Sequence, residues 1–120
     1  MTGQTYPEYR SQLRSLLSKL GTDLQGPMSG FGQLHEAALA DGVLSAKVKE
    51  LIALAIAVSA RCKGFIAFHT YDALRAGASR PEIVETLGVA VLMGGGPSAM
   101  YAGEALEALQ QFQTAATAKS

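Results

Sequence analysis

The stretch SAKVKELIALAIAV, residues 45–58, decides the fold. Ser45 is suited to cap a helix, because its hydroxyl can accept a hydrogen bond from a free backbone N–H group of the first turn. After a charged first turn, residues 51–58 are all apolar and rich in leucine and alanine, which favour a helix. We therefore predict a helix here, apolar on every side and central in an all-α protein.

Glycine, proline and capping residues divide the rest of the chain into further helices. Gly21 and Gly77 follow apolar segments, as expected of residues that end helices. Ser79 and Glu82 have the spacing of a capping box, in which each side chain bonds the other residue's backbone N–H. The predicted helices cover about residues 7–20, 27–40, 45–58, 61–76, 79–93 and 97–113. We expect residues 114–120 to fray.

Length and composition predict one small domain that associates with copies of itself. The chain has 120 residues, of which 48% are hydrophobic and 17% charged. This is one domain over residues 1–120, with no linker to a second. A chain this short buries roughly two thirds of its unfolded surface. Its mean hydropathy of +0.17 exceeds what a monomer easily hides, so we expect a homo-oligomer.

Charge and cysteine content exclude several classes of function. Ten basic and ten acidic residues give a net charge of +0, which lacks the positive surface that nucleic-acid binding needs. The start of the chain does not resemble a signal peptide, and the longest apolar run, residues 51–58, is too short to span a membrane. With one cysteine, an internal disulfide and a multi-thiolate zinc site are excluded, and a cytoplasmic location is expected.

Four residues around the third and fourth predicted helices could carry chemistry: Glu50, Cys62, Phe65 and His69. Seven residues advance a helix by about 700° and 10.5 Å, so Cys62 and His69 face alike but do not touch. Phe65 lies between them, four residues before His69, and should contact it. Glu50 must reach His69 from the preceding helix. An imidazole and a carboxylate that converge on a half-buried face are suited to proton transfer.

These residues and their surroundings resemble the carboxymuconolactone decarboxylase and alkylhydroperoxidase D-like family. The likeness rests on Glu50, the spacing of eleven residues to Cys62, and His69, with DGVLSAKVKELIALA before them and MGGGPS after them. It covers about residues 27–113. The resemblance implies an all-helical fold that assembles as a dimer, trimer or hexamer. It also implies a site formed by Glu50, Cys62 and His69.

The chain departs from the family's peroxidase branch at Phe65. That branch uses a Cys-x-x-Cys pair with Glu and His as a thiol relay, and the second cysteine falls on Phe65. A benzyl group can neither form nor resolve a disulfide, so the two-cysteine catalytic cycle cannot operate in this chain. The acidic residue that often follows the family's histidine falls on Arg80, although Glu82 is near.

Three functions remain open. The first is cofactor-free proton transfer or decarboxylation of a small organic acid, with His69 as proton donor or acceptor, Glu50 orienting it and Phe65 lining an apolar pocket. The second is a one-cysteine peroxidase in which Cys62, near a helix start and between two cations, is oxidised and then reduced by an external thiol. The third is a non-catalytic oligomeric binding protein.

Each of these residues also has a purely structural interpretation. Cys62 could be an inert small hydrophobe, His69 a buried histidine satisfied by one hydrogen bond, and Glu50 the partner of Arg61 or Lys47 in a salt bridge. His35 is expected at the surface or at a subunit interface. With only two histidines and one cysteine, we expect no metal site and no cofactor.

Overall fold

A computed structural model describes residues 3–118 and shows six helices and no strand in that range. The helices are α1 (Tyr6–Asp23), α2 (Gln25–Leu39), α3 (Ala46–Ser59), α4 (Lys63–Arg75), α5 (Arg80–Gly94) and α6 (Gly96–Ala118). The predicted all-α fold is confirmed. No helix in the described range is both long and apolar enough to cross a membrane.

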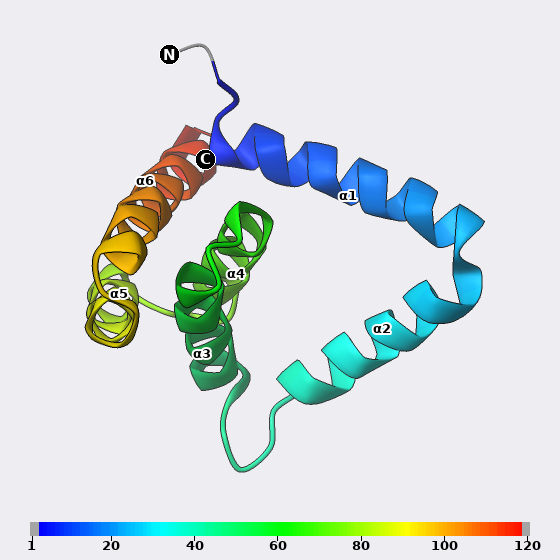
Figure 1. The fold of residues 1–120 in the computed structure, drawn as a ribbon, viewed down its shortest axis with the longest axis horizontal. Coiled ribbons are helices and arrows are strands. Elements are labelled where there is room, and N and C mark those ends of the chain that lie inside the picture. Colours follow the sequence, from blue (N-terminus) through cyan, green and yellow to red (C-terminus); the bar gives the residue numbers. More distant parts are fainter. Residues whose placement is uncertain (1–2, 119–120) are drawn as a thin grey trace.

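The core lies among α3, α4, α5 and α6, which pack side by side (Figure 1). Its largest fully buried apolar side chains are Leu54, Ile66, Ile83, Leu109 and Val58. Many of the other buried positions are alanines, which let the helices approach closely. The helices that carry Glu50 and His69, α3 and α4, are therefore held in a fixed relation by the core.

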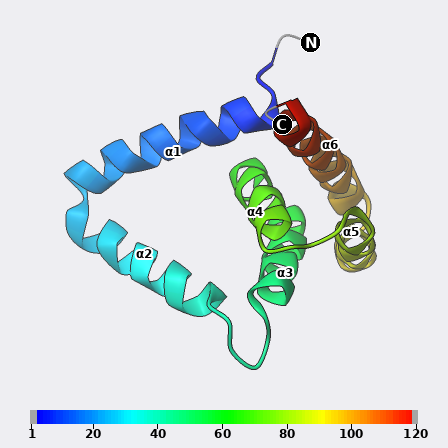
Figure 2. The same ribbon diagram turned by 180° about the vertical axis from the view of Figure 1, so that it is seen from behind.

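The first two helices form an arm beside this core. From the C-terminal end of α6, α1 runs outward, and α2 returns towards the start of α3 (Figure 2). Tyr6, at the start of α1, is buried, whereas α2 buries none of its residues. The arm therefore packs against the core mainly through the first half of α1.

Caps fix the starts of three helices. Ser79 and Glu82 form the predicted capping box at α5, and the Ser45 hydroxyl accepts from the backbone N–H of Val48 at α3. Thr5 and Glu8 form a second capping box at α1. Backbone and side-chain hydrogen bonds within its box, with the Lys47 ammonium, lower the pKa of Glu82 to about 2.

Some helix ends differ from those predicted. Helix α1 continues through Gly21 to Asp23, because a glycine within a helix weakens it by only about 1 kcal/mol and need not end it. At the other end, α6 continues to Ala118, so a frayed tail from residue 114 was wrong over the described residues. Helix α4 begins at Lys63, two residues late, because Arg61 has a left-handed backbone with a φ of 59°.

Helix α3 is less enclosed than predicted. Leu54 and Val58 are fully buried against the core, but Ile52 is 45% and Ile56 62% exposed. A helix that is apolar all round was expected at the centre of the molecule. Helix α3 does pack against α4, α5 and α6, but the side that carries Ile52 and Ile56 faces outward. In the single chain, its outer face remains apolar and uncovered.

The capping box at α5 provides a stability test. Ser79→Ala removes a hydroxyl that accepts from the Glu82 backbone N–H, and should lower the free energy of unfolding by about 1 kcal/mol. Ser18→Ala, at an exposed position within α1, is the control and should change it little. Urea denaturation of both variants measures the difference, and equal stabilities would contradict this role of the cap.

Candidate functional site

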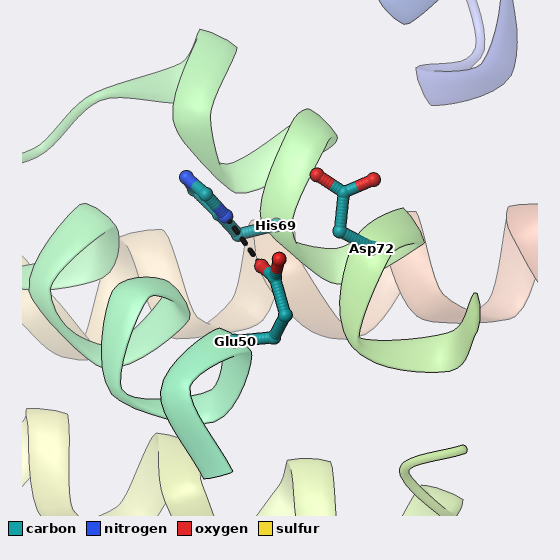
Figure 3. Close-up of side chains that lie close together, drawn as sticks. All are labelled: Glu50, His69 and Asp72. Carbon is teal, nitrogen blue, oxygen red and sulfur yellow. Dashed lines mark hydrogen bonds and ion pairs between the residues drawn. The ribbon is translucent and has the colours of Figure 1, made fainter. Parts of the chain in front are cut away.

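Glu50 and His69 meet in the interior between α3 and α4. The His69 Nδ1 atom lies 2.8 Å from Glu50 Oε1, and Figure 3 shows the bond joining the two helices. Both residues are buried, with Glu50 8% and His69 6% exposed. The sequence prediction that Glu50 reaches His69 from the preceding helix is confirmed in its geometry.

The hydrogen bond defines the roles of the two ring nitrogens. An ionised carboxylate can only accept hydrogen bonds, so with Glu50 in that form Nδ1 of His69 is the donor. In the neutral ring, Nε2 is then the nitrogen with a free lone pair. Within residues 3–118, Nε2 has no hydrogen-bond partner. His69 is thus hydrogen-bonded at one ring nitrogen and unbonded at the other within these residues.

Two rings pack beside the His69 imidazole. Phe65, one turn earlier on α4, has its ring centre 5.6 Å away at an angle of 36°, which confirms the predicted contact. His35 of α2 is stacked at 5.9 Å and 24°. His35 is exposed, as expected of a surface residue. Its stacking on His69 was not predicted, because the sequence does not show that α2 returns towards α3 and brings His35 within reach of α4.

Asp72 is a third polar group at this site, and sequence analysis missed it. It lies one helical turn after His69 on α4, and single ligand atoms of Glu50, His69 and Asp72 all lie within 4.8 Å of one another. Burial raises the pKa of Asp72, while the nearby His69 and Arg10 pull it down. The i, i+3 spacing of His69 and Asp72 was the available signal.

These three residues could also hold a divalent cation. Two carboxylates and an imidazole are ordinary ligands for zinc or a related transition metal. In the structure, Nδ1 of His69 is hydrogen-bonded to Glu50. The hydrogen bond, which needs no added group, is the arrangement that these side chains adopt here.

Cys62 is not part of the polar cluster that Glu50, His69 and Asp72 form. It is the N-cap of α4, where its Sγ atom accepts from the Phe65 backbone N–H at 3.5 Å. The thiol is free and partly buried. Of its two cationic neighbours, Lys63 has its Nζ atom over the rings of Tyr6 and Tyr9, 5.6 Å and 5.1 Å from their centres. Cys62 makes no hydrogen bond to His69 in the described chain, as the helical spacing predicts.

The alternative salt bridge predicted for Glu50 is wrong. Lys47 pairs instead with Glu82 of α5, at 2.9 Å between Nζ and Oε2. Among residues 3–118, the ion-pair partner of Glu50 is His69. Lys47 and Glu50 are three positions apart on α3, but Lys47 reaches α5 and Glu50 reaches α4. Arg61 makes no ion pair within residues 3–118.

Cavities of several hundred Å³ lie away from this cluster. One of about 490 Å³ lies between α1, α4 and α6, and one of about 420 Å³ lies between α3 and α5. The apolar pocket expected beside Phe65 stays a prediction. Phe65 itself is 43% exposed, so its ring lies at the surface next to the buried pair.

Comparison with known proteins agrees with this architecture. The sequence pattern of the carboxymuconolactone decarboxylase family matches residues 27–108. The chain therefore belongs to the carboxymuconolactone decarboxylase family. Its fold superimposes on the crystal structure of a family protein from Legionella pneumophila with a TM-score of 0.87 and 44% identity, over 92% of this chain and 98% of that one.

Other relatives extend the comparison. An uncharacterized protein of Cupriavidus necator is 44% identical over 96 residues, which is 80% of this chain and 85% of the relative. An uncharacterized protein from the cox locus of Paracoccus denitrificans is 35% identical over 71% of this chain and 77% of its own. A Thermotoga maritima family protein, for which an antioxidative role has been suggested, has a TM-score of 0.79 and 26% identity over 97% and 96% of the two chains.

The raised pKa of Asp72 predicts a particular dependence of stability on pH. The folded protein binds this proton more readily than the unfolded chain, whose ordinary value is 3.8. Protonation of Asp72 therefore stabilises the folded state fully below pH 3.8, and this stabilisation is lost as the pH rises through the pKa of Asp72 in the folded protein. Relative to the wild type, Asp72→Asn should gain stability between about pH 3 and pH 7.

Urea denaturation across this pH range measures the effect. Asp23→Asn, at the exposed end of α1, removes the same charge far from the site and serves as the control. A stability difference between wild type and Asp72→Asn that stays constant, or moves the other way with pH, would contradict the burial of an ionisable Asp72.

Proposed function

We propose that this protein is a cofactor-free acid–base enzyme that acts on a small organic acid, by proton transfer or decarboxylation, through His69. The observation that supports this most directly is the buried 2.8 Å hydrogen bond between Glu50 and His69 Nδ1. A histidine held by a carboxylate at one nitrogen is a common arrangement for general acid–base catalysis. Membership of a family named for a decarboxylase is consistent with the proposal.

In this proposal, Glu50 is a positioning residue and His69 is the catalytic one. Glu50 accepts from Nδ1–H and balances positive charge when the ring is protonated. Nε2 of His69 gives or takes the proton, as its lack of a hydrogen-bond partner within residues 3–118 allows. Phe65 supplies an apolar wall beside the ring. Asp72, one turn away on α4, adds a second carboxyl group beside Glu50 and His69.

Decarboxylation by such a site is balanced without a cofactor. The bond between the substrate carbon and its carboxylate breaks, and CO₂ leaves. The electron pair passes into an adjacent unsaturated bond, and the imidazolium Nε2–H of His69 then protonates carbon. Solvent returns the proton to His69. An apolar wall favours the loss of CO₂, because a carboxylate is less stable there than the neutral product.

Replacement of His69 tests the proposal. With carboxymuconolactone as the probe substrate, His69→Gln and His69→Ala should each lower the rate of CO₂ release at least about 100-fold. Cys62→Ser should keep most of the wild-type rate of CO₂ release. His69→Gln keeps a side chain that can donate to Glu50, so circular dichroism should show the wild-type helix content in this variant. Loss of turnover in Cys62→Ser but not in the His69 variants would contradict the assignment.

A one-cysteine peroxidase is the second candidate, and the position of Cys62 favours it. The sulfur lies at the start of α4, where the Phe65 backbone N–H points to it. A thiolate there would attack a peroxide oxygen, break the O–O bond and become a sulfenic acid, with water or an alcohol leaving. Two molecules of an external thiol would then reduce it. If the wild type reduces peroxide with dithiothreitol and Cys62→Ser does not, the protein is a one-cysteine peroxidase.

We also propose that the protein is a homo-oligomer in which a second copy covers the arm. Helix α2 buries no residue in the single chain. Large apolar side chains are exposed along the second half of α1, the following turn and α2, namely Leu16, Leu17, Leu20, Leu24, Phe31 and Leu34. A stripe of this kind is unusual on a monomer and typical of an interface.

A charge placed in the stripe tests the oligomer. Leu34 is 64% exposed, so Leu34→Glu should not disturb the fold of the single chain but should weaken association. By sedimentation velocity, the wild type should be oligomeric and Leu34→Glu should shift to a slower species. Val43→Glu, at a fully exposed loop position, is the control. A wild-type monomer at micromolar concentration would contradict the proposal.

A further inference from the structure

We propose that the cavity between α1, α4 and α6 is a second binding site, which takes a small organic acid with two anionic groups on an apolar body. The cavity measures about 490 Å³, which is within the range of small-molecule sites. Its side chains divide into a cationic group and an apolar group. The cationic group is Arg10, Arg14 and Arg75, and the other lining residues include Tyr71, Phe112, Pro7 and Ala115.

The charge in this cavity is unbalanced. Three of the chain's five arginines line it, in a protein with net charge +0, and no lining residue is acidic. Over residues 3–118, no carboxylate lies within ion-pair distance of these guanidinium groups. Burial lowers the pKa of Arg10, and repulsion from Arg14 and Arg75 adds to this effect, whereas the nearby charge of Asp72 opposes it. An anion in the cavity would relieve this repulsion.

Arg10 is held in place and incompletely bonded. Its guanidinium carbon lies 3.7 Å from the ring centre of Tyr71 and 5.5 Å from that of Phe68. The Nε atom is buried and has no hydrogen-bond partner among the residues that the structure describes. The Tyr71 hydroxyl in turn accepts from Arg75 Nη1 at 3.1 Å. Tyr71 therefore positions two of the guanidinium groups, and Arg10 retains an unused donor.

The lining indicates the chemistry of the ligand. A guanidinium presents parallel N–H groups that match the two oxygens of a carboxylate or phosphate. Because Arg75 comes from α4 and Arg14 from α1, the cationic groups approach from two sides and suit two anionic groups. Phe112 is buried at the apolar wall and favours a ring or short hydrocarbon between them.

Neither Glu50 nor His69 lines this cavity, although the charges of Arg10 and Asp72 act on each other. At 100° per residue, Tyr71 and Arg75 lie roughly 200° and 240° around α4 from His69. They therefore face α1 and α6, whereas His69 faces α3 and α2. The inference does not rest on the proposed catalytic function. It can be tested by binding alone, without turnover.

Calorimetric titration with isophthalate, a benzene dicarboxylate, tests the site. Isophthalate should bind with one molecule per chain and at least about tenfold more tightly than benzoate, which offers one carboxylate. Phenyl phosphate distinguishes the two sources of negative charge, and tighter binding than isophthalate would assign the site to phosphate esters. Neutral isophthalamide, with the same ring and no charge, should not bind.

A double substitution shows whether isophthalate binds in this cavity. Arg14→Gln with Arg75→Gln, both at exposed positions, should weaken isophthalate binding at least about tenfold without unfolding the chain. Arg80→Gln removes an exposed arginine at the start of α5 and should not. Equal weakening by Arg80→Gln, no effect of the double substitution, or binding of isophthalamide as tight as that of isophthalate would overturn the proposal.

Discussion

The hydrogen bond between Glu50 and His69 is the interaction on which the site depends. A carboxylate taken out of water is costly unless it is paired, and the same holds for an imidazole that loses its hydrogen bonds. Here each group satisfies the other across the contact between α3 and α4. Because the surrounding positions are filled by core residues such as Leu54 and Ile66, neither partner can turn away to solvent without disturbing the packing. The bond therefore fixes both the joint between two helices and the orientation of the histidine.

Much of the fold could be predicted because the signals were local. Ser45 and the box of Ser79 and Glu82 cap helices where expected, since capping involves residues only three positions apart. The contact between Phe65 and His69 followed from helical spacing in the same way. The pairing of Glu50 with His69 was expected from their places on successive helices, and the family resemblance implied a site at the same two residues. Gly21 misled the prediction because a glycine can weaken a helix without ending it.

The remaining features depend on contacts between distant segments. His35 stacks on His69 only because α2 returns towards α3 and α4, and nothing within residues 27–40 specifies that path. Arg10 and Arg75 meet across 65 positions of sequence, since α1 crosses beside α4. Asp72 could have been found from its spacing to His69, but its burial could not, because that depends on the helices around it. Tertiary packing thus turned ordinary surface charges into candidate binding groups.

The connection between α3 and α4 contains two residues that lower its local stability. Arg61 adopts a left-handed backbone with a φ of 59°, a conformation that glycine or asparagine reaches at lower cost. The next residue, Cys62, caps α4 with a sulfur atom 3.5 Å from the N–H it serves, and a serine or aspartate hydrogen-bonds there more strongly. Optimisation of helix formation alone would select neither residue. Two consecutive unfavourable choices, directly between the helices that supply Glu50 and His69, are the kind of local conflict that proteins retain where chemistry, rather than folding, sets the requirement.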